Sequence, residues 1–266
     1  MNVYDFEYDN LRLSDFGYII CSFGSKGLQT VSSGSNLTFN TVSVRNGEKH
    51  ELTSAEYNEC LETTFQICKN TCENRDLEMS FDEYRDLISW LNRKGFHKIQ
   101  FLDYNDEYSD VYFEASFNIS RIESDGKLCG LELNMITNRP FALHNPISIM
   151  FETSEANQKR KIINSSDEEG FIYPHMEITV KENGDLSIYN QSEDRNMYIA
   201  NCEVGERITL DYPIIQTSLS SHKIQNDFNW NFFRLVSTFN YSINQISISL
   251  PCEIKMVYSP IVKVSI

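Results

Sequence analysis

Hydrophobic and polar residues follow two different periods in this chain, and the period changes between residues 79 and 122. From Ser80 to Gly95 the apolar side chains recur three and four positions apart, which is the spacing of one helix face. Ser80 and Glu83 form the capping box that begins a helix, and a basic turn before Gly95 ends it. From Val111 to Ser120 every second residue is apolar, which predicts a strand with one buried face. The apolar helix positions are Tyr84, Leu87, Ile88 and Leu91.

The rest of the chain is dominated by strand patterns. Residues 57–69 fit both periods, and their threonine pair and flanking turn residues favour a strand. The Gly/Ser-rich segment Ser22–Ser35 predicts a loop or flexible arm. Asn183-Gly184 lies between two alternating runs and predicts a β-hairpin. Further expected strands are Val3–Tyr8, Gly17–Phe23, Asn36–Val44, His97–Asp103, Gly130–Met135, Glu206–Tyr212, Gln245–Leu250 and Glu253–Ser259.

These elements predict a mainly β protein of two domains. The segment that contains Pro140 and Pro146 has neither helix nor strand periodicity, and we place the domain boundary there. Residues 1–137 are expected to form an α+β domain around the single helix. Residues 138–266, with strands at the spacing of about 8–12 residues that is typical of sandwiches, are expected to form a β-sandwich.

Composition and charge narrow the functional classes. With 266 residues, 41% hydrophobic and 12% aromatic, the chain can bury a substantial core. A formal charge of −15 argues against tight nucleic-acid binding, which needs clustered Lys and Arg. No apolar run reaches the length of a membrane span, and residues 1–10 are acidic where a secretion signal would be basic and then apolar. We therefore expect synthesis in a cytoplasm and no membrane insertion.

No motif predicts catalysis or a cofactor. Cys68 and Cys72, with Cys60 nearby, have no second ligand pair with which to complete a zinc site. The oxygen-rich turn 103–110 has no glycine at the sixth position of a calcium loop. Ser220–Lys223 has serine–lysine spacing without the companion motifs of such enzymes. We therefore expect no enzyme activity, no metal and no cofactor, and we interpret the seven scattered cysteines as small hydrophobic residues.

Aromatic residues are the most promising contact groups. The densest cluster is Phe228–Leu235, and a ring on a sandwich surface can stack on a sugar. Packing in a core or at a subunit interface is the competing interpretation. Trp90, off the apolar stripe of the helix, and Trp230 are therefore the candidates for contact with a glycan or another subunit.

The order of these features resembles distal tail proteins of long-tailed phages of Gram-positive bacteria. The resemblance is carried by the Trp90-Leu91-Asn92 step followed by "KGFHK", by the "LELNMITNRPFA" exit near Ala142, and by "VKENGDLSIYN" with "INQISISLPCEIKMVYSP" in the second half. The second half is similar to the galectin-like β-sandwich of that family. The sugar-binding motifs of galectins are absent, and the spacing of "WNFFR" differs from theirs.

The resemblance implies an assembly role in a virion tail tip, with synthesis in the host bacterial cytoplasm. Six copies of the N-terminal domain would close into a ring that joins the tail tube protein to the tail-associated hub protein, with a receptor-binding protein as a further partner. Head-to-tail contacts that close by rotation make such rings.

Two other functions remain open on the sequence. One is a carbohydrate-binding module or adhesin that contacts host cell-wall glycan. The other is a cell-wall hydrolase, although no carboxylate pair can be singled out among 38 acidic residues.

Overall fold

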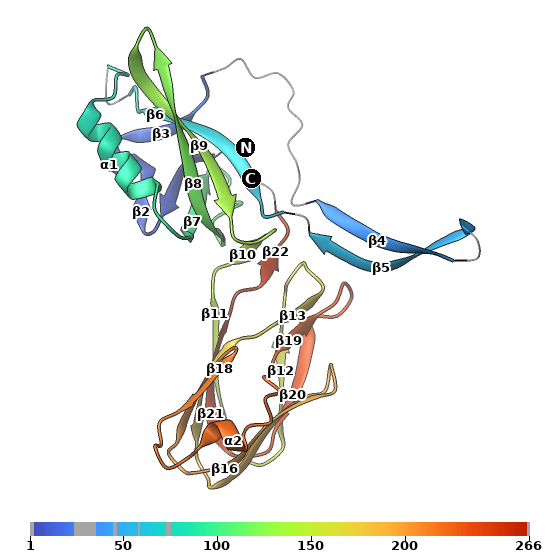
Figure 1. Cartoon of the computed structure of the whole chain (residues 1–266). Helices are drawn as coiled ribbons and strands as arrows, with labels where there is room; N and C mark the ends of the chain where they lie inside the picture. Colours follow the sequence, from blue (N-terminus) through green and yellow to red (C-terminus); the bar gives the residue numbers. More distant parts are fainter. Residues whose placement is uncertain (1–2, 24–35, 45–46, 58, 73–75, 265–266) are drawn as a thin grey trace. The chain divides into compact units, whose positions relative to one another are not determined.

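The computed structural model describes residues 3–23, 36–44, 47–57, 59–72 and 76–264. Most of the expected arm Ser22–Ser35 lies outside these residues. Contacts divide the chain into unit 1, Met1–Leu143 with Lys263–Ile266, and unit 2, His144–Val262 (Figure 1). We expected the boundary at 137/138. Unit 1 continues to Leu143 because strand β10 (Ala142–His144) still pairs with β8 (Val111–Ser124).

The strands of unit 1 form an antiparallel sheet in the order β2-β1-β7-β8-β9-β6-β3. The ambiguous segment 57–69 is a strand over Glu62–Lys69, as expected. The elements of unit 1 besides β8 and β10 are β1 (Val3–Tyr8), β2 (Leu11–Arg12), the 3-10 helix η1 (Leu13–Phe16), β3 (Tyr18–Cys21), β4 (Leu37–Val44), β5 (Lys49–Tyr57), β6 (Glu62–Lys69), α1 (Phe81–Leu91), β7 (His97–Asp103) and β9 (Lys127–Thr137).

The predicted helix and its cap are present in α1. The Ser80 oxygen accepts a hydrogen bond from the Glu83 N–H at 3.3 Å, and the Glu83 carboxylate accepts one from the Ser80 N–H at 2.7 Å. The helix ends at Leu91, before the expected basic turn. The alternation in β8 also holds, because Val111, Phe113, Ala115 and Phe117 are all buried. The core that these elements cover is a group of interlocking rings: Phe6, Tyr8, Phe65, Trp90, Phe101 and Phe117.

Strands β4 and β5 form a separate hairpin. They pair only with each other among the described residues, from Leu37 opposite Tyr57 to Val44 opposite Lys49. Almost every side chain of both strands is exposed, including large apolar ones. A sheet of two strands with no covered face is marginally stable in water. The hairpin therefore presents apolar surface that the described residues of its own unit do not cover.

Unit 2 is a sandwich of two antiparallel sheets, with strand orders β11-β21-β14-β17-β18 and β12-β20-β15-β16 (Figure 1). Inward side chains of both sheets share one core, in which Ile178 and Leu186 are representative. The elements of unit 2 are β11 (Ile147–Thr153), β12 (Gln158–Ile163), β13 (Gly170–Ile172), β14 (His175–Val180), β15 (Gly184–Asn190), β16 (Arg195–Cys202), β17 (Arg207–Asp211), β18 (Ile214–Thr217), α2 (Ile224–Asp227), β19 (Leu235–Ser237), β20 (Ile243–Ile248), β21 (Cys252–Tyr258) and β22 (Ile261–Val262).

The hairpin predicted at Asn183-Gly184 is wrong. Strand β14 pairs with β17 and β21, whereas β15 pairs with β16 and β20 in the other sheet. The turn is therefore a corner that carries the chain from one layer to the other. The Asn183 side-chain oxygen accepts a hydrogen bond from the Val204 N–H at 2.7 Å, which ties the corner to a neighbouring loop. The overall class is nevertheless as predicted: mainly β, with one long helix followed by a sandwich.

Candidate functional site

Trp90 packs inside unit 1. Its side chain lies on the buried face of α1, and its indole N–H donates to the Tyr8 carbonyl at 3.2 Å. The ring is stacked between Phe16, with a centroid distance of 4.5 Å, and Phe6, at 5.8 Å. The buried face of the helix is therefore wider than the apolar stripe that the sequence predicted, because it also includes Trp90. This side chain contributes to packing within unit 1.

Trp230 has the opposite environment. Its side chain is 55% exposed, and its backbone φ is +57°. Left-handed backbone is uncommon outside glycine and is an outlier for a bulky residue, so the surrounding structure must hold it there. The indole N–H donates to the Gln225 carbonyl at 3.2 Å, which fixes the orientation of the ring against α2.

The segment before β19 is anchored to the edge of β16. The Asn229 side-chain oxygen accepts from the N–H groups of Tyr198 and Asn231, and both asparagine amides donate to the Asn196 carbonyl. Arg195 donates from its Nε to the Phe232 carbonyl at 2.8 Å. These bonds cover the open edge of the four-stranded sheet, which would otherwise expose unpaired backbone groups.

Four partly exposed rings of unit 2 are linked in space through ring contacts, and we call them the aromatic strip: Phe171, Tyr173, Tyr212 and Trp230. Tyr173 and Tyr212 stack with centroids 3.9 Å apart and planes 5° apart, and Phe171 meets Tyr173 edge-on. The buried ring of Phe232 contacts both Tyr212 and Trp230, with centroid distances of 5.3 and 6.4 Å, and so connects these two rings. Of the strip, only Trp230 was expected to be a contact residue. The others come from distant segments, so no local sequence pattern reveals the group.

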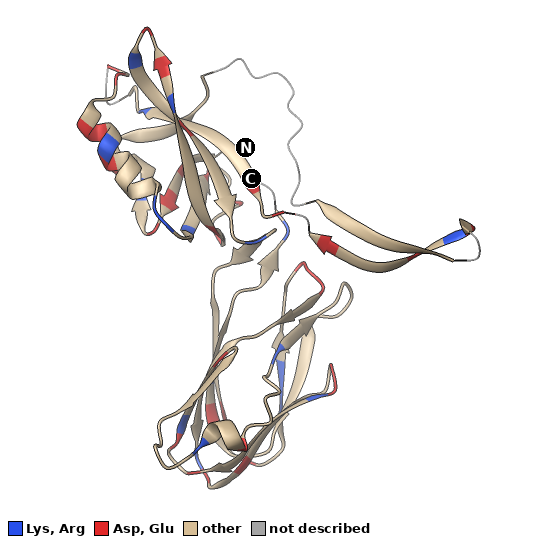
Figure 2. Cartoon of the chain, in the orientation of Figure 1, with Lys and Arg blue, Asp and Glu red and all other residues tan. Residues whose placement is uncertain are grey.

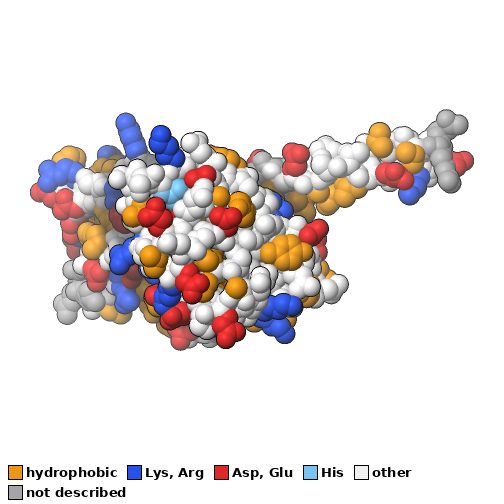
Figure 3. Space-filling view, turned by 90° about the horizontal axis from the view of Figure 1, so that it is seen from below, with side chains coloured by type: hydrophobic (Ala, Val, Ile, Leu, Met, Phe, Trp, Pro, Cys, Tyr) orange, Lys and Arg blue, Asp and Glu red, His pale blue; other side chains and the backbone are white. Residues whose placement is uncertain are grey.

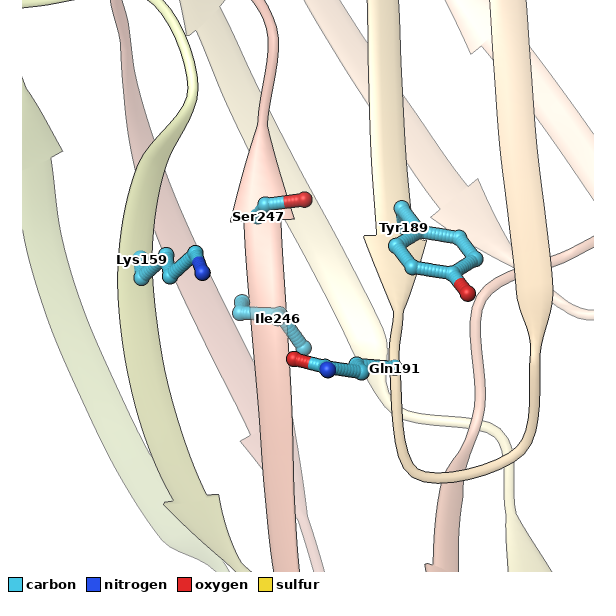
Figure 4. Close-up of a pocket in the computed structure, with 5 residues that line it drawn as sticks. All are labelled: Lys159, Tyr189, Gln191, Ile246 and Ser247. Carbon is cyan, nitrogen blue, oxygen red and sulfur yellow. The ribbon is translucent and has the colours of Figure 1, made fainter.

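Two open hollows lie on the outer faces of the sandwich. The one on the five-stranded sheet has a volume of about 460 Å³ and a mixed polar and apolar lining, in which Glu177 and Lys255 pair at 3.2 Å. The one on the four-stranded sheet has a volume of about 220 Å³. Figure 4 shows Lys159 and Gln191 on opposite sides of β20, with Tyr189 on the neighbouring strand. Both hollows are open to water, unlike the enclosed surroundings that most catalytic sites provide.

The cysteines are not brought together as metal ligands. Cys60 and Cys72 are exposed and Cys68 is buried, and no group of three or more metal-binding side chains occurs among the described residues. Burial raises the pKa of the Cys202 thiol to about 12, and it also raises the pKa of Cys252. These two thiols are therefore unreactive core side chains at neutral pH.

The oxygen-rich turn 103–110 is held by Asp103. Its carboxylate accepts N–H donors from Asn105 at 2.7 Å, Glu107 at 3.1 Å and Tyr108 at 2.9 Å. Burial opposes ionisation, but the backbone donors prevail and lower the pKa of the Asp103 carboxyl. The carboxylate thus stabilises the turn between β7 and β8.

In the Ser220–Lys223 segment, Ser220 and Lys223 are exposed, whereas His222 between them is buried and pairs with Glu206. His222 Nδ1 lies 2.7 Å from the Glu206 carboxylate, which also accepts hydrogen bonds from the Thr217 hydroxyl and, at 3.0 Å, the Glu203 N–H. The side chains of Glu206 and His222 are 0% and 3% exposed, so a substrate cannot reach them. The pair links the β17–β18 hairpin to the segment before α2.

Charged residues are distributed without a basic surface for nucleic acid in the part of the chain that the structure describes. Lysines and arginines are scattered over both units, apart from the short run Lys159–Lys161 in β12 (Figure 2). The face in Figure 3 shows acidic and basic side chains interspersed, with hydrophobic ones in small separate groups. Neither helix of the described chain is long and apolar enough to cross a membrane.

The exposed surfaces of this β-rich protein are an uncovered hairpin, a strip of aromatic rings and two open hollows. Such surfaces suit binding to other molecules. The sequence matches two family profiles, the phage tail protein N-terminal domain over residues 1–139 and the phage tail C-terminal domain over residues 141–258. The chain therefore belongs to this family of phage tail proteins, as the sequence predicted. No curated protein matches it.

The fold is similar to a solved structure, the Dit protein (gp 19.1) of phage SPP1, described as a paradigm of the hub adsorption apparatus in phages that infect Gram-positive bacteria. The two share a TM-score of 0.66 and 10% sequence identity, and the match covers 97% of this chain and 99% of the other. At this identity the likeness establishes the fold.

Proposed function

We propose that this chain forms a ring at the distal end of a phage tail, where it connects the tail tube protein to the tail-associated hub protein and helps to assemble the device for host adhesion. Six copies are the number that the family resemblance implies, and the sandwich would be of the galectin-like type. The hub role described for SPP1 Dit supports this proposal, because the two folds correspond over nearly their whole lengths.

The uncovered β4–β5 hairpin is the observation that carries the proposal. Leu37, Phe39, Val42 and Leu52 are 42–60% exposed although they lie on paired strands. Both outer edges of the hairpin also present backbone groups that no described strand uses. A second copy that packs against the hairpin would bury these four side chains, and repetition of that head-to-tail contact would close a ring of subunits.

The test is assembly of the purified full chain, measured by light scattering over a range of concentrations and by negative-stain images. We expect rings of uniform subunit number. The double variant Phe39→Ser/Leu52→Ser should require at least about tenfold more protein to assemble, because it removes two of the apolar contacts. Phe81→Ser is the matched control, since this phenyl on α1 is 72% exposed but lies outside the hairpin.

Rings that form equally well with the double variant would exclude the hairpin as the ring contact. A chain that stays monomeric at every concentration, also with purified tail tube protein present as a template, would contradict the ring itself.

A further inference from the structure

The aromatic strip lies in unit 2, whereas the proposed ring contact lies in unit 1. From the strip's geometry we infer that it is a binding site for an uncharged polysaccharide chain, with Trp230 and Tyr212 as stacking platforms. The inference does not depend on ring formation, because every part of the site belongs to one unit of one chain.

Three rings of the strip contact each other, and Trp230 is joined to them through the buried Phe232. Phe171, Tyr212 and Trp230 are 49%, 53% and 55% exposed. Single exposed hydrophobic residues are normal, whereas contiguous ones mark binding surfaces. Phe171, Tyr212 and Trp230, each about half exposed, together with the less exposed Tyr173, offer roughly 400 Å². This is half of the ~800 Å² that one side of a stable protein interface buries. A narrow row of rings is better suited to a linear chain than to a protein surface.

The platforms are rigid before any ligand arrives. Trp230 is fixed by its hydrogen bond to the Gln225 carbonyl and by the left-handed backbone that Asn229 and Asn231 hold in place. Tyr212 is fixed by its parallel stack with Tyr173. Binding then costs little conformational entropy, which is the usual reason for preorganised aromatic contacts.

The surroundings supply the polar groups that a sugar requires. A pyranose ring has an apolar C–H face, which can stack on an aromatic ring, and hydroxyls around its rim. Gln225 and Asn226 are exposed residues of α2, the helix whose Gln225 carbonyl accepts the Trp230 indole N–H, and neither side-chain amide has a hydrogen-bond partner in the described part of the chain. An amide offers both donors and an acceptor, so it can bond to hydroxyls in either sense.

Charge selects an uncharged ligand. Arg234, the cation at one end of the strip, is bonded to Glu193 at 2.6 Å and lies 4.0 Å from the Phe171 ring centre. It is therefore already neutralised. With a formal charge of −15 the chain repels polyanions. Single-stranded nucleic acid also stacks on aromatic rings, but its binding needs a basic groove beside them.

We would test the inference by affinity electrophoresis of the full chain in native gels that contain a soluble glucan, galactan, mannan or rhamnan. A gel with poly(glycerol phosphate) teichoic acid serves as the polyanion. We expect retardation by at least one uncharged polysaccharide and none by teichoic acid. Trp230→Ala and Tyr212→Ala should each raise the Kd about tenfold, and Trp230→Phe should raise it less, because a smaller ring still stacks.

Phe239→Ala is the matched control, since it removes a phenyl that is 88% exposed in unit 2 but lies outside the strip. This variant should bind like the parent chain, and near-ultraviolet circular dichroism should show that every variant is folded. Three results would overturn the inference: no retardation by any of the four uncharged polysaccharides, an equal loss in Phe239→Ala, or a Trp230→Ala variant whose only change is weaker self-association. Ring formation is scored separately on the same samples by light scattering.

Discussion

Tyr18 shows how one buried polar atom affects the stability of unit 1. The residue is 3% exposed, and its hydroxyl has no hydrogen-bond partner among the described residues. An unsatisfied buried hydroxyl costs about 1–3 kcal/mol. We therefore predict that Tyr18→Phe, which removes the oxygen and keeps the ring, raises the free energy of unfolding at pH 7 by about 1 kcal/mol in urea denaturation. Tyr18→Ala, which removes the ring, should instead lower it by several kcal/mol.

The same residue predicts a pH dependence. Burial, with a smaller effect of the Glu83 carboxylate, raises the pKa of Tyr18 to about 12 from the ordinary value of 10.0. The unfolded chain thus loses this proton at lower pH than the folded chain, and the stability tied to neutral Tyr18 declines as pH rises from about 10 to about 12. Tyr18→Phe should make that decline shallower. An identical alkaline profile in the variant would show that Tyr18 titrates normally.

At the residue scale, the sequence could not separate the two tryptophans. Both were contact candidates, because Trp90 lies off the leucine stripe and Trp230 lies in the densest aromatic cluster. Burial of Trp90 depends on Phe6 and Phe16, which come from the distant N-terminal segment. The exposure of Trp230 depends on a left-handed backbone conformation, which the neighbouring residue types do not predict.

At the scale of the element, the capping box of α1 is the clearest local signal in the chain. We predict that Ser80→Ala lowers the free energy of unfolding by about 1 kcal/mol, because the Glu83 N–H loses its acceptor. Ser89→Ala is the control within the same helix. The Ser89 hydroxyl donates only to the Arg85 carbonyl one turn earlier, an arrangement that adds little stability. Equal effects of the two substitutions in chemical denaturation would argue against the cap.

The corner at Asn183-Gly184 shows where element prediction fails. The two flanking segments are strands, as their alternation indicates, but alternation specifies only which side chains face inward. Both β14 and β15 bury the same kind of apolar face, and each can do so in either layer of a sandwich. Their pairing is decided by β17, β21, β16 and β20, the farthest of which pairs His175 with Val257, 82 residues along the chain.

At the scale of the whole molecule, each unit has the internal organisation of a domain. The core of unit 2 is one cluster drawn from both of its sheets. We therefore predict that a fragment of residues 144–262 folds alone, with a single cooperative urea transition and the near-ultraviolet circular dichroism expected of its ordered Trp230 and tyrosines. A fragment of residues 164–262, which lacks edge strands β11 and β12, should lose cooperativity. A fragment 144–262 without fixed aromatic signals would mean that unit 2 needs the rest of the chain.

The sequence by itself determined the periodic elements, because a helix cap or a β alternation is encoded within a few residues: α1, β1, β7 and β8 lie where the pattern indicates. Its resemblance to a family of tail proteins identified the class as well. The tertiary structure alone decided which layer each strand of unit 2 joins, which tryptophan is exposed, and that the described residues of unit 1 do not cover the β4–β5 hairpin. The tertiary structure also brought together the rings of the aromatic strip from distant segments. These are properties of contacts between distant segments, and long-range packing is set by the whole chain at once rather than by any local run of residues.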